Sequence, residues 1–131
     1  MDTQSKKYTI LVVEDEVPLL NALVGKFFRE GFSVLQAKNG EEGLESALKN
    51  RPDLILLDIV MPRMDGMTML KKLREDAWGK TVEVIMLSNL SELAKVAEAV
   101  AQGSYEYLVK SNWKIEDVVT KVRERLETPH S

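Results

Sequence analysis

The chain has 131 residues, of which 44% are hydrophobic, and this length is typical of one compact domain. It has no cysteine, which excludes disulfide frameworks and thiolate metal sites and fits a reducing, cytoplasmic setting. Its 18 basic and 21 acidic side chains are mixed along the chain and give a net charge of −3, so we expect no direct binding to nucleic acid. Every apolar run is shorter than the roughly 18 residues that a membrane-spanning helix needs, so we expect a soluble protein.

Five short segments are expected to form β-strands, because most of them are continuous apolar runs of the kind found in strands buried on both faces. In chain order they are residues 8–13, 34–37, 54–57, 82–87 and 106–109. Longer stretches with helical spacing follow them. Leu20, Leu23 and Phe27 mark the first of these stretches, and Val118 and Val122 mark the last. Five strands are therefore expected to alternate with five helices.

Residues that begin and end helices agree with this assignment. Gly31 and Gly103 follow helical stretches, where a left-handed cap is favoured, and Pro18 stands in a first turn. Asn39, with Glu42 three residues later, resembles a capping box.

Alternating strands and helices predict right-handed crossovers and a doubly wound parallel α/β sheet. We interpret residues 1–131 as a single domain with a core of about 7–127 and short polar tails at 1–6 and 128–131. No repeat or linker divides the chain.

Acidic side chains follow two of the expected strands. Glu14, Asp15 and Glu16 come after the first strand, and Asp58 comes directly after the third. The carboxyl ends of parallel strands meet at one edge of the sheet, so Glu14, Asp15 and Asp58 are expected to converge there. Two carboxylates about 5 Å apart repel by roughly 3 kcal/mol at an effective dielectric constant near 20, which favours a bound divalent cation such as Mg²⁺.

A hydroxyl and an ammonium group are expected at the same edge, because Ser88 follows the fourth strand and Lys110 follows the fifth. A carboxylate nucleophile, a metal, a cation and a hydrogen-bond donor together suit phosphoryl transfer to an aspartate. Taken singly, each group has a simpler interpretation: the acids as helix caps, the lysine as a solvated side chain and the serine as a helix-start hydroxyl.

The string LDIVMPRMDG at residues 57–66 resembles the phosphoacceptor segment of response-regulator receiver domains. Glu14, Asp15, Ser88 and Lys110 occur in the order that this family shows, so the resemblance covers almost the whole chain. It implies a flavodoxin-like five-stranded sheet in the order 2-1-3-4-5 with five helices, as in chemotaxis-regulator-like receivers.

The resemblance also implies roles for individual residues. Asp58 would accept the phosphoryl group, and Ser88 and Lys110 would contact it. Tyr107 would turn as the switch residue of the signalling surface. The implied metal site holds Mg²⁺ through Glu14, Asp15, Asp58 and the carbonyl of Val60, with Glu14 acting through a metal-bound water.

The partners that the resemblance implies are a sensor histidine kinase or phosphotransfer protein upstream and an effector or output domain downstream. The resemblance is also compatible with a homodimer formed through the fourth and fifth helices. The domain would assist its own phosphorylation and dephosphorylation in two-component signalling and would not act as a separate enzyme.

Three other functions compete with this interpretation. A haloacid-dehalogenase-like phosphatase requires a second aspartate two residues after the nucleophile, where this chain has Val60. A flavodoxin-like electron carrier binds phosphate with a Ser/Thr/Gly-rich loop after the first strand, where Glu14, Asp15 and Glu16 would repel it. A receiver that works through its surface without phosphorylation is the third.

The chain departs from the common receiver pattern at several places. Ser111 follows Lys110 where proline is usual, and Asn89 follows Ser88 where a small residue is usual. Val60 and Leu90 are apolar at the positions that flank the attacking water in this family, and neither can orient that water by hydrogen bonding.

We therefore predict a long-lived phosphoaspartate on this chain. The measurement is the amount of labelled phosphoprotein followed over time after the phosphodonor is removed. Loss of the label within seconds would contradict the prediction.

Overall fold

A parallel β-sheet forms the centre of the fold in a computed structural model that describes residues 7–88, 101, 106–109 and 114–127. The strand order is β2-β1-β3-β4-β5, and every pair of neighbours is parallel. The strands are β1 (Thr9–Val13), β2 (Ser33–Ala37), β3 (Leu54–Asp58), β4 (Glu83–Ser88) and β5 (Glu106–Val109). This is the flavodoxin-like, doubly wound arrangement that the sequence predicts.

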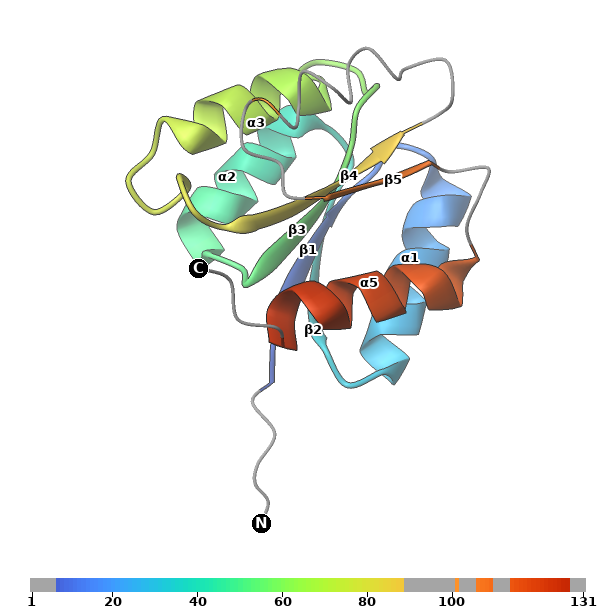
Figure 1. The fold of residues 1–131 in the computed structure, drawn as a ribbon. Helices are drawn as coiled ribbons and strands as arrows, with labels where there is room; N and C mark the ends of the chain where they lie inside the picture. The colour runs from blue at the N-terminus through green and yellow to red at the C-terminus, as the bar shows by residue number, and fades with distance from the viewer. Residues whose placement is uncertain (1–6, 89–100, 102–105, 110–113, 128–131) are drawn as a thin grey trace.

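Helices cover both faces of the sheet (Figure 1). α2 (Gly40–Asn50) and α3 (Gly66–Arg74) lie on one face, and α1 (Val17–Arg29) and α5 (Ile115–Glu127) lie on the other. The helix expected between β4 and β5 falls largely at residues 89–100 and 102–105, outside the described residues, as do the expected tails.

The central strands are apolar over most of their length because each of their faces packs against a helix layer. In β1, Leu11 and Val13 belong to the core under α2 and α3, whereas Ile10 and Val12 belong to the core under α1 and α5. All of these side chains are fully buried. This double burial explains why the strands show continuous apolar runs and not an alternating pattern.

Two strands extend one residue further than the sequence suggests. Asp58 is the last residue of β3 and pairs with Leu87, and Ser88 is the last residue of β4 and pairs with Val109. Backbone pairing thus continues to the first polar residue, so the Asp58 backbone is held by the sheet itself.

The helix ends form as expected from local chemistry. Pro18 lies in the first turn of α1, and Gly31 has a φ of 96°, the left-handed conformation that glycine adopts without strain. Asn39 caps α2 by accepting a hydrogen bond from the Glu42 N–H at 2.9 Å. The Glu42 carboxylate accepts in turn from the backbone N–H of Lys38 at 3.1 Å. Gly103 lies outside the described residues.

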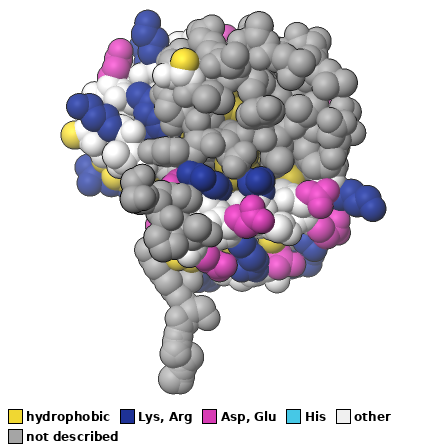
Figure 2. All heavy atoms as spheres, in the orientation of Figure 1, with side chains coloured by type: hydrophobic (Ala, Val, Ile, Leu, Met, Phe, Trp, Pro, Cys, Tyr) yellow, Lys and Arg dark blue, Asp and Glu magenta, His cyan; other side chains and the backbone are white. Residues whose placement is uncertain are grey.

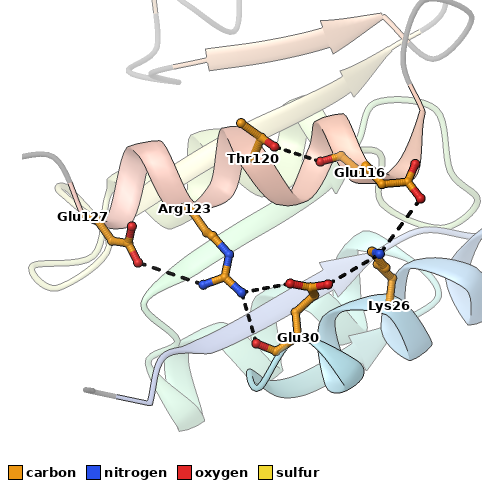
Figure 3. A network of polar contacts seen from close by, with 6 residues as sticks. All are labelled: Lys26, Glu30, Glu116, Thr120, Arg123 and Glu127. Atoms are coloured by element: carbon orange, nitrogen blue, oxygen red, sulfur yellow. Dashed lines mark hydrogen bonds and ion pairs between the residues drawn. The ribbon is translucent and has the colours of Figure 1, made fainter. Parts of the chain in front are cut away.

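Charged side chains tie α5 to the C-terminal end of α1 (Figure 3). Arg123 donates to the Glu30 carboxylate at 3.0 Å and to its carbonyl oxygen at 3.1 Å, and its guanidinium lies 4.9 Å from the centre of the Phe32 ring. Lys26 lies 3.4 Å from Glu30 and 3.9 Å from Glu116. These contacts hold residues from distant parts of the sequence beside one another.

The hydrogen bond from Arg123 is the main cause that lowers the pKa of Glu30, and Lys26 lowers it further. A carboxyl with a lower pKa in the folded chain stabilises the fold above its ordinary pKa. This contribution is lost as the pH falls through the lowered value.

A further ion pair attaches α5 to the sheet. Arg125 donates to Glu83 Oε1 through Nε at 3.2 Å and through Nη2 at 3.0 Å. Both side chains are 17% exposed, so the pair is more shielded from solvent than the Arg123 contacts. Helix α5 is therefore fixed at its C-terminal half by two arginines.

Acidic and basic side chains are interspersed on the face of the molecule that carries α5 (Figure 2). Among the described residues, none of the helices has the length and apolar character needed to cross a membrane.

We predict that Leu23→Ala lowers the free energy of unfolding by about 2–5 kcal/mol, because Leu23 is fully buried and its truncation leaves a cavity. Leu48 is 40% exposed on α2, so the same substitution there should change stability by less than about 0.5 kcal/mol. Urea unfolding of both variants measures the difference. Equal losses would contradict the packing described for α1.

Candidate functional site

The register of the sheet brings two acidic residues side by side. Val13 of β1 is the parallel partner of Leu57 in β3, so the next residues, Glu14 after β1 and Asp58 at the end of β3, lie at the same edge of the sheet. Asp15 comes one residue later, at the turn into α1. The convergence expected from the order of strands is therefore present in the structure.

Glu14, Asp15 and Asp58 form a compact carboxylate cluster, with one oxygen from each lying within 4.8 Å of the others. Glu14 is fully buried and Asp58 is 4% exposed, while Asp15 is the most exposed of the three. Two members of the cluster are therefore buried, and one is accessible to solvent.

Three carboxylates at this spacing destabilise the fold unless a positive charge offsets them. At 4.8 Å a pair of unit charges repels by about 3 kcal/mol at an effective dielectric constant near 20. Carboxylate oxygens are hard ligands, which suits Mg²⁺ better than a softer metal. The donor set therefore fits a site for a hard divalent cation.

Local hydrogen bonds set the position of Glu14. Its backbone N–H donates to the carbonyl of Ala37 at 3.0 Å, and its carboxylate accepts from the N–H of Glu16 at 3.0 Å. Helix α1 starts directly afterwards, at Val17. The turn that carries Asp15 is thus fixed at both ends.

The β3–α3 loop, residues 59–65, closes over the end of β3. The N–H of Ile59 donates to the carbonyl of Leu87 at 3.3 Å, and the carbonyl of Ile59 accepts from the N–H of Gly66 at 2.8 Å. Val60 lies in this loop and is 50% exposed. Asp65 caps α3 by accepting from the Thr68 N–H at 2.8 Å.

Gly66 has a role that sequence analysis alone did not identify. A Cβ on Gly66 would overlap the carbonyl oxygen of Asp58 and would lie 3.0 Å from its carbonyl carbon. Only glycine allows the start of α3 to approach the backbone of Asp58 this closely. The Asp-Gly pair in the string was the available signal, and it could be interpreted equally well as a turn.

The remaining expected site residues are less fully described. Ser88 ends β4 and Tyr107 lies in β5, which places their backbones near the same sheet edge, and the roles of their side chains stay predictions. Lys110 lies outside the described residues, as do Asn89, Leu90 and Ser111. The structure thus brings together Glu14, Asp15 and Asp58, with Val60 two residues beyond Asp58.

Comparison with known protein families gives a match over most of the chain. The family model of the response regulator receiver domain matches residues 10–123. The transcriptional regulatory protein PrrA of Mycobacterium bovis is 37% identical over 123 residues, covering 94% of this chain and 52% of PrrA. RpaA of Synechocystis, a DNA-binding dual master transcriptional regulator, is 30% identical over 87% of this chain and 47% of its own length.

The chain thus spans about half the length of these two relatives, and 8% of another relative, histidine kinase P4 of Formosa agariphila, which is 34% identical over 108 residues. Solved structures agree with these matches. The chemotaxis protein CheY4 of Vibrio cholerae has a TM-score of 0.84 at 27% identity, covering 92% of this chain and 99% of CheY4. The receiver domain of the Francisella response regulator 1452 has a TM-score of 0.83 at 29% identity, covering 92% and 98%.

We predict that Asp15→Asn raises the free energy of unfolding by about 1 kcal/mol in metal-free buffer. The substitution removes one repelling charge, and solvent screens the repulsion of Asp15 because it is the most exposed member of the cluster. Urea unfolding with a chelator present measures this change. Adding Mg²⁺ at ten times its dissociation constant should stabilise the native chain by about 1.4 kcal/mol and the variant by less.

Glu45→Gln removes an exposed acid from α2 and serves as the control, with a change below about 0.5 kcal/mol. Destabilisation of Asp15→Asn in the absence of metal would contradict the repulsion described above.

Proposed function

Because the chain belongs to the response regulator receiver domain family, we propose that it is a phosphoacceptor in which Asp58 receives a phosphoryl group from a phosphohistidine. The observation that carries this proposal is the cluster of Glu14, Asp15 and Asp58, whose carboxylate oxygens lie within 4.8 Å of one another. Receiver domains are signalling domains, so the activity proposed is phosphorylation of the domain itself.

In the proposed reaction, a carboxylate oxygen of Asp58 attacks the phosphorus of the donor. A P–O bond to Asp58 forms as the P–N bond to the donor imidazole breaks, and the imidazole takes up a proton. Such transfers depend mainly on alignment and on neutralisation of charge on the phosphoryl oxygens. Near-complete burial restricts the movement of the Asp58 side chain, since only 4% of the residue is exposed, and this supports alignment for the attack.

Mg²⁺ would supply the positive charge that offsets the carboxylates and the phosphoryl oxygens. Asp15, Asp58 and the carbonyl of Val60 would hold it, and Glu14 would act through a metal-bound water. The hard oxygen donors of the cluster support this assignment.

Three more residues have proposed roles toward the phosphoryl group. Lys110 would pair with its charge and Ser88 would donate a hydrogen bond to one of its oxygens. Tyr107 would turn as the loop after β4 moves, and so change the surface that includes β5 and α5. The positions of Ser88 at the end of β4 and Tyr107 in β5 are consistent with these roles.

The exposed, apolar side chain of Val60 supports slow hydrolysis of the phosphoaspartate, because it cannot orient an attacking water by hydrogen bonding. It also argues against the phosphatase alternative, which requires an aspartate at this position. The acidic residues after β1 argue against a flavin phosphate at the same edge.

The proposed partners follow from this chemistry and from the family. A sensor histidine kinase or phosphotransfer protein would donate the phosphoryl group, and an effector or output domain would respond to it. PrrA and RpaA are named as transcriptional regulators, which supports a regulatory output. We propose one receiver domain over 1–131 in a cytoplasmic protein. We also propose a helix between β4 and β5, the fourth of five in chain order, and dimerisation through that helix and α5.

We predict that acetyl phosphate with Mg²⁺ adds one phosphoryl group to the native chain and none to Asp58→Asn. Intact-mass spectrometry measures the addition, and omission of Mg²⁺ should reduce it strongly because the carboxylate cluster then repels the donor. Peptide mapping should place the group on Asp58.

Asp53→Asn is the matched control, because Asp53 bonds Thr9 at the opposite end of β3 and should leave the addition unchanged. Equal phosphorylation of native chain and Asp58→Asn would overturn the proposal. No addition to the native chain under any condition would favour a receiver that acts without phosphorylation.

A further inference from the structure

The first residue of α2 contacts the loop that follows Asp58, although the two lie far apart in the sequence. The N–H of Gly40 donates to the carbonyl oxygen of Met64 at 2.8 Å. A Cβ on Gly40 would overlap that oxygen and would lie 2.8 Å from the carbonyl carbon and 2.9 Å from the Met64 Cβ. The contact therefore requires glycine at this position.

This contact has a physical cause in the geometry of helices. The first N–H groups of a helix have no partner within the helix and must bond to something else. Asn39 satisfies the N–H of Glu42, and the Met64 carbonyl satisfies that of Gly40. The β3–α3 loop thus acts as part of the N-terminal cap of α2.

The loop, in turn, takes a conformation that needs such support. Arg63 has a φ of 67°, which is unfavourable for a residue with a side chain and persists only where the surroundings impose it. Met64 donates its N–H to the carbonyl of Pro62 at 2.8 Å, which tightens the turn. An exposed ion pair between Arg63 and Glu41 at 3.3 Å adds a second link to α2.

Three backbone hydrogen bonds restrict the loop on either side of Val60. They are the Ile59 bond to β4, the Gly66 bond back to Ile59 and the Gly40 bond to Met64. The first two hold Ile59, the residue before Val60, against β4 and the start of α3, and the third holds Met64, near the C-terminal end of the loop, against α2.

We propose that Gly40 is a positioning residue for the cation site, because it holds the β3–α3 loop so that the Val60 carbonyl and Asp58 face the same ion. This inference rests on the proposed function, in which the Val60 carbonyl is a metal ligand. Any side chain at position 40 pushes Met64 outward and moves the loop that carries this carbonyl.

A matched control exists one turn further along the same helix. A Cβ on Gly43 would lie 2.9 Å from the sulfur of Met69 and 2.9 Å from a methyl group of Val13. Gly43→Ala therefore also introduces crowding, but against core side chains of α3 and β1. Both variants should lose stability, and only Gly40→Ala should affect the cation site.

The test measures Mg²⁺ binding by titration calorimetry for the native chain, Gly40→Ala and Gly43→Ala, together with urea unfolding in metal-free buffer. We expect Gly40→Ala to raise the dissociation constant for Mg²⁺ by about 10-fold or more, as loss of a supporting contact to a metal ligand commonly does. Gly43→Ala should change it by less than about 2-fold, with a smaller loss of stability, because its Cβ meets side chains and not the backbone. Equal dissociation constants for all three proteins would overturn the inference.

Amide hydrogen exchange gives a second test. It uses the native chain alone, so it does not depend on whether a variant folds. Coupling between two sites is reciprocal, so Mg²⁺ must protect the Gly40 N–H if the Gly40 contact favours Mg²⁺. The Arg51 N–H, bonded to Ala47 at the other end of α2, should exchange at an unchanged rate. If the exchange rate of the Gly40 N–H does not change when Mg²⁺ is added, the coupling between the Gly40 contact and the cation site is refuted.

The two proposals fail in distinguishable ways. A native chain that binds no Mg²⁺ overturns both the metal-assisted function and the role of Gly40. A native chain that binds Mg²⁺ and is phosphorylated, while Gly40→Ala binds it equally well, overturns the role of Gly40 alone.

Discussion

Mutual repulsion among three carboxylates at one edge of the sheet is the constraint on which the rest of the site depends. Parallel pairing of β1 with β3 places Glu14 beside Asp58, and neither residue has more than slight exposure to water. A fold optimised only for stability would not gather like charges in this way. The arrangement is explained if a cation and a transferred phosphoryl group are part of the working state.

The fold permits this arrangement because packing and backbone hydrogen bonds hold the backbone around the acidic residues in place. The acidic side chains do not have to contribute to this. Asp58 belongs to a strand that is buried on both faces, and Gly66 lets α3 approach its carbonyl without steric conflict. The loop between them is tied to β4 by Ile59 and to α2 by Gly40. Apolar packing and backbone hydrogen bonds thus stabilise the fold and offset the repulsion among the three carboxylates.

Much of the fold and of the carboxylate cluster could be predicted from the sequence, because the patterns that indicate them are local. Continuous apolar runs identified the strands, and their alternation with helical stretches implied which strand ends meet, which placed Asp58 near Glu14. The close approaches of Gly40 and Gly66 could not be predicted, since they depend on where a distant backbone segment lies. The contact of Arg123 with Glu30, the C-cap of α1, also joins positions far apart in the chain, and no local pattern marks it.

The most direct test of the central claim is crystallography of the chain with Mn²⁺ in place of Mg²⁺, using the anomalous signal of the metal to locate it. We expect a single strong anomalous peak coordinated by Asp15, Asp58 and the carbonyl oxygen of Val60. Absence of a peak between these groups at saturating Mn²⁺, or a peak elsewhere on the surface alone, would contradict it.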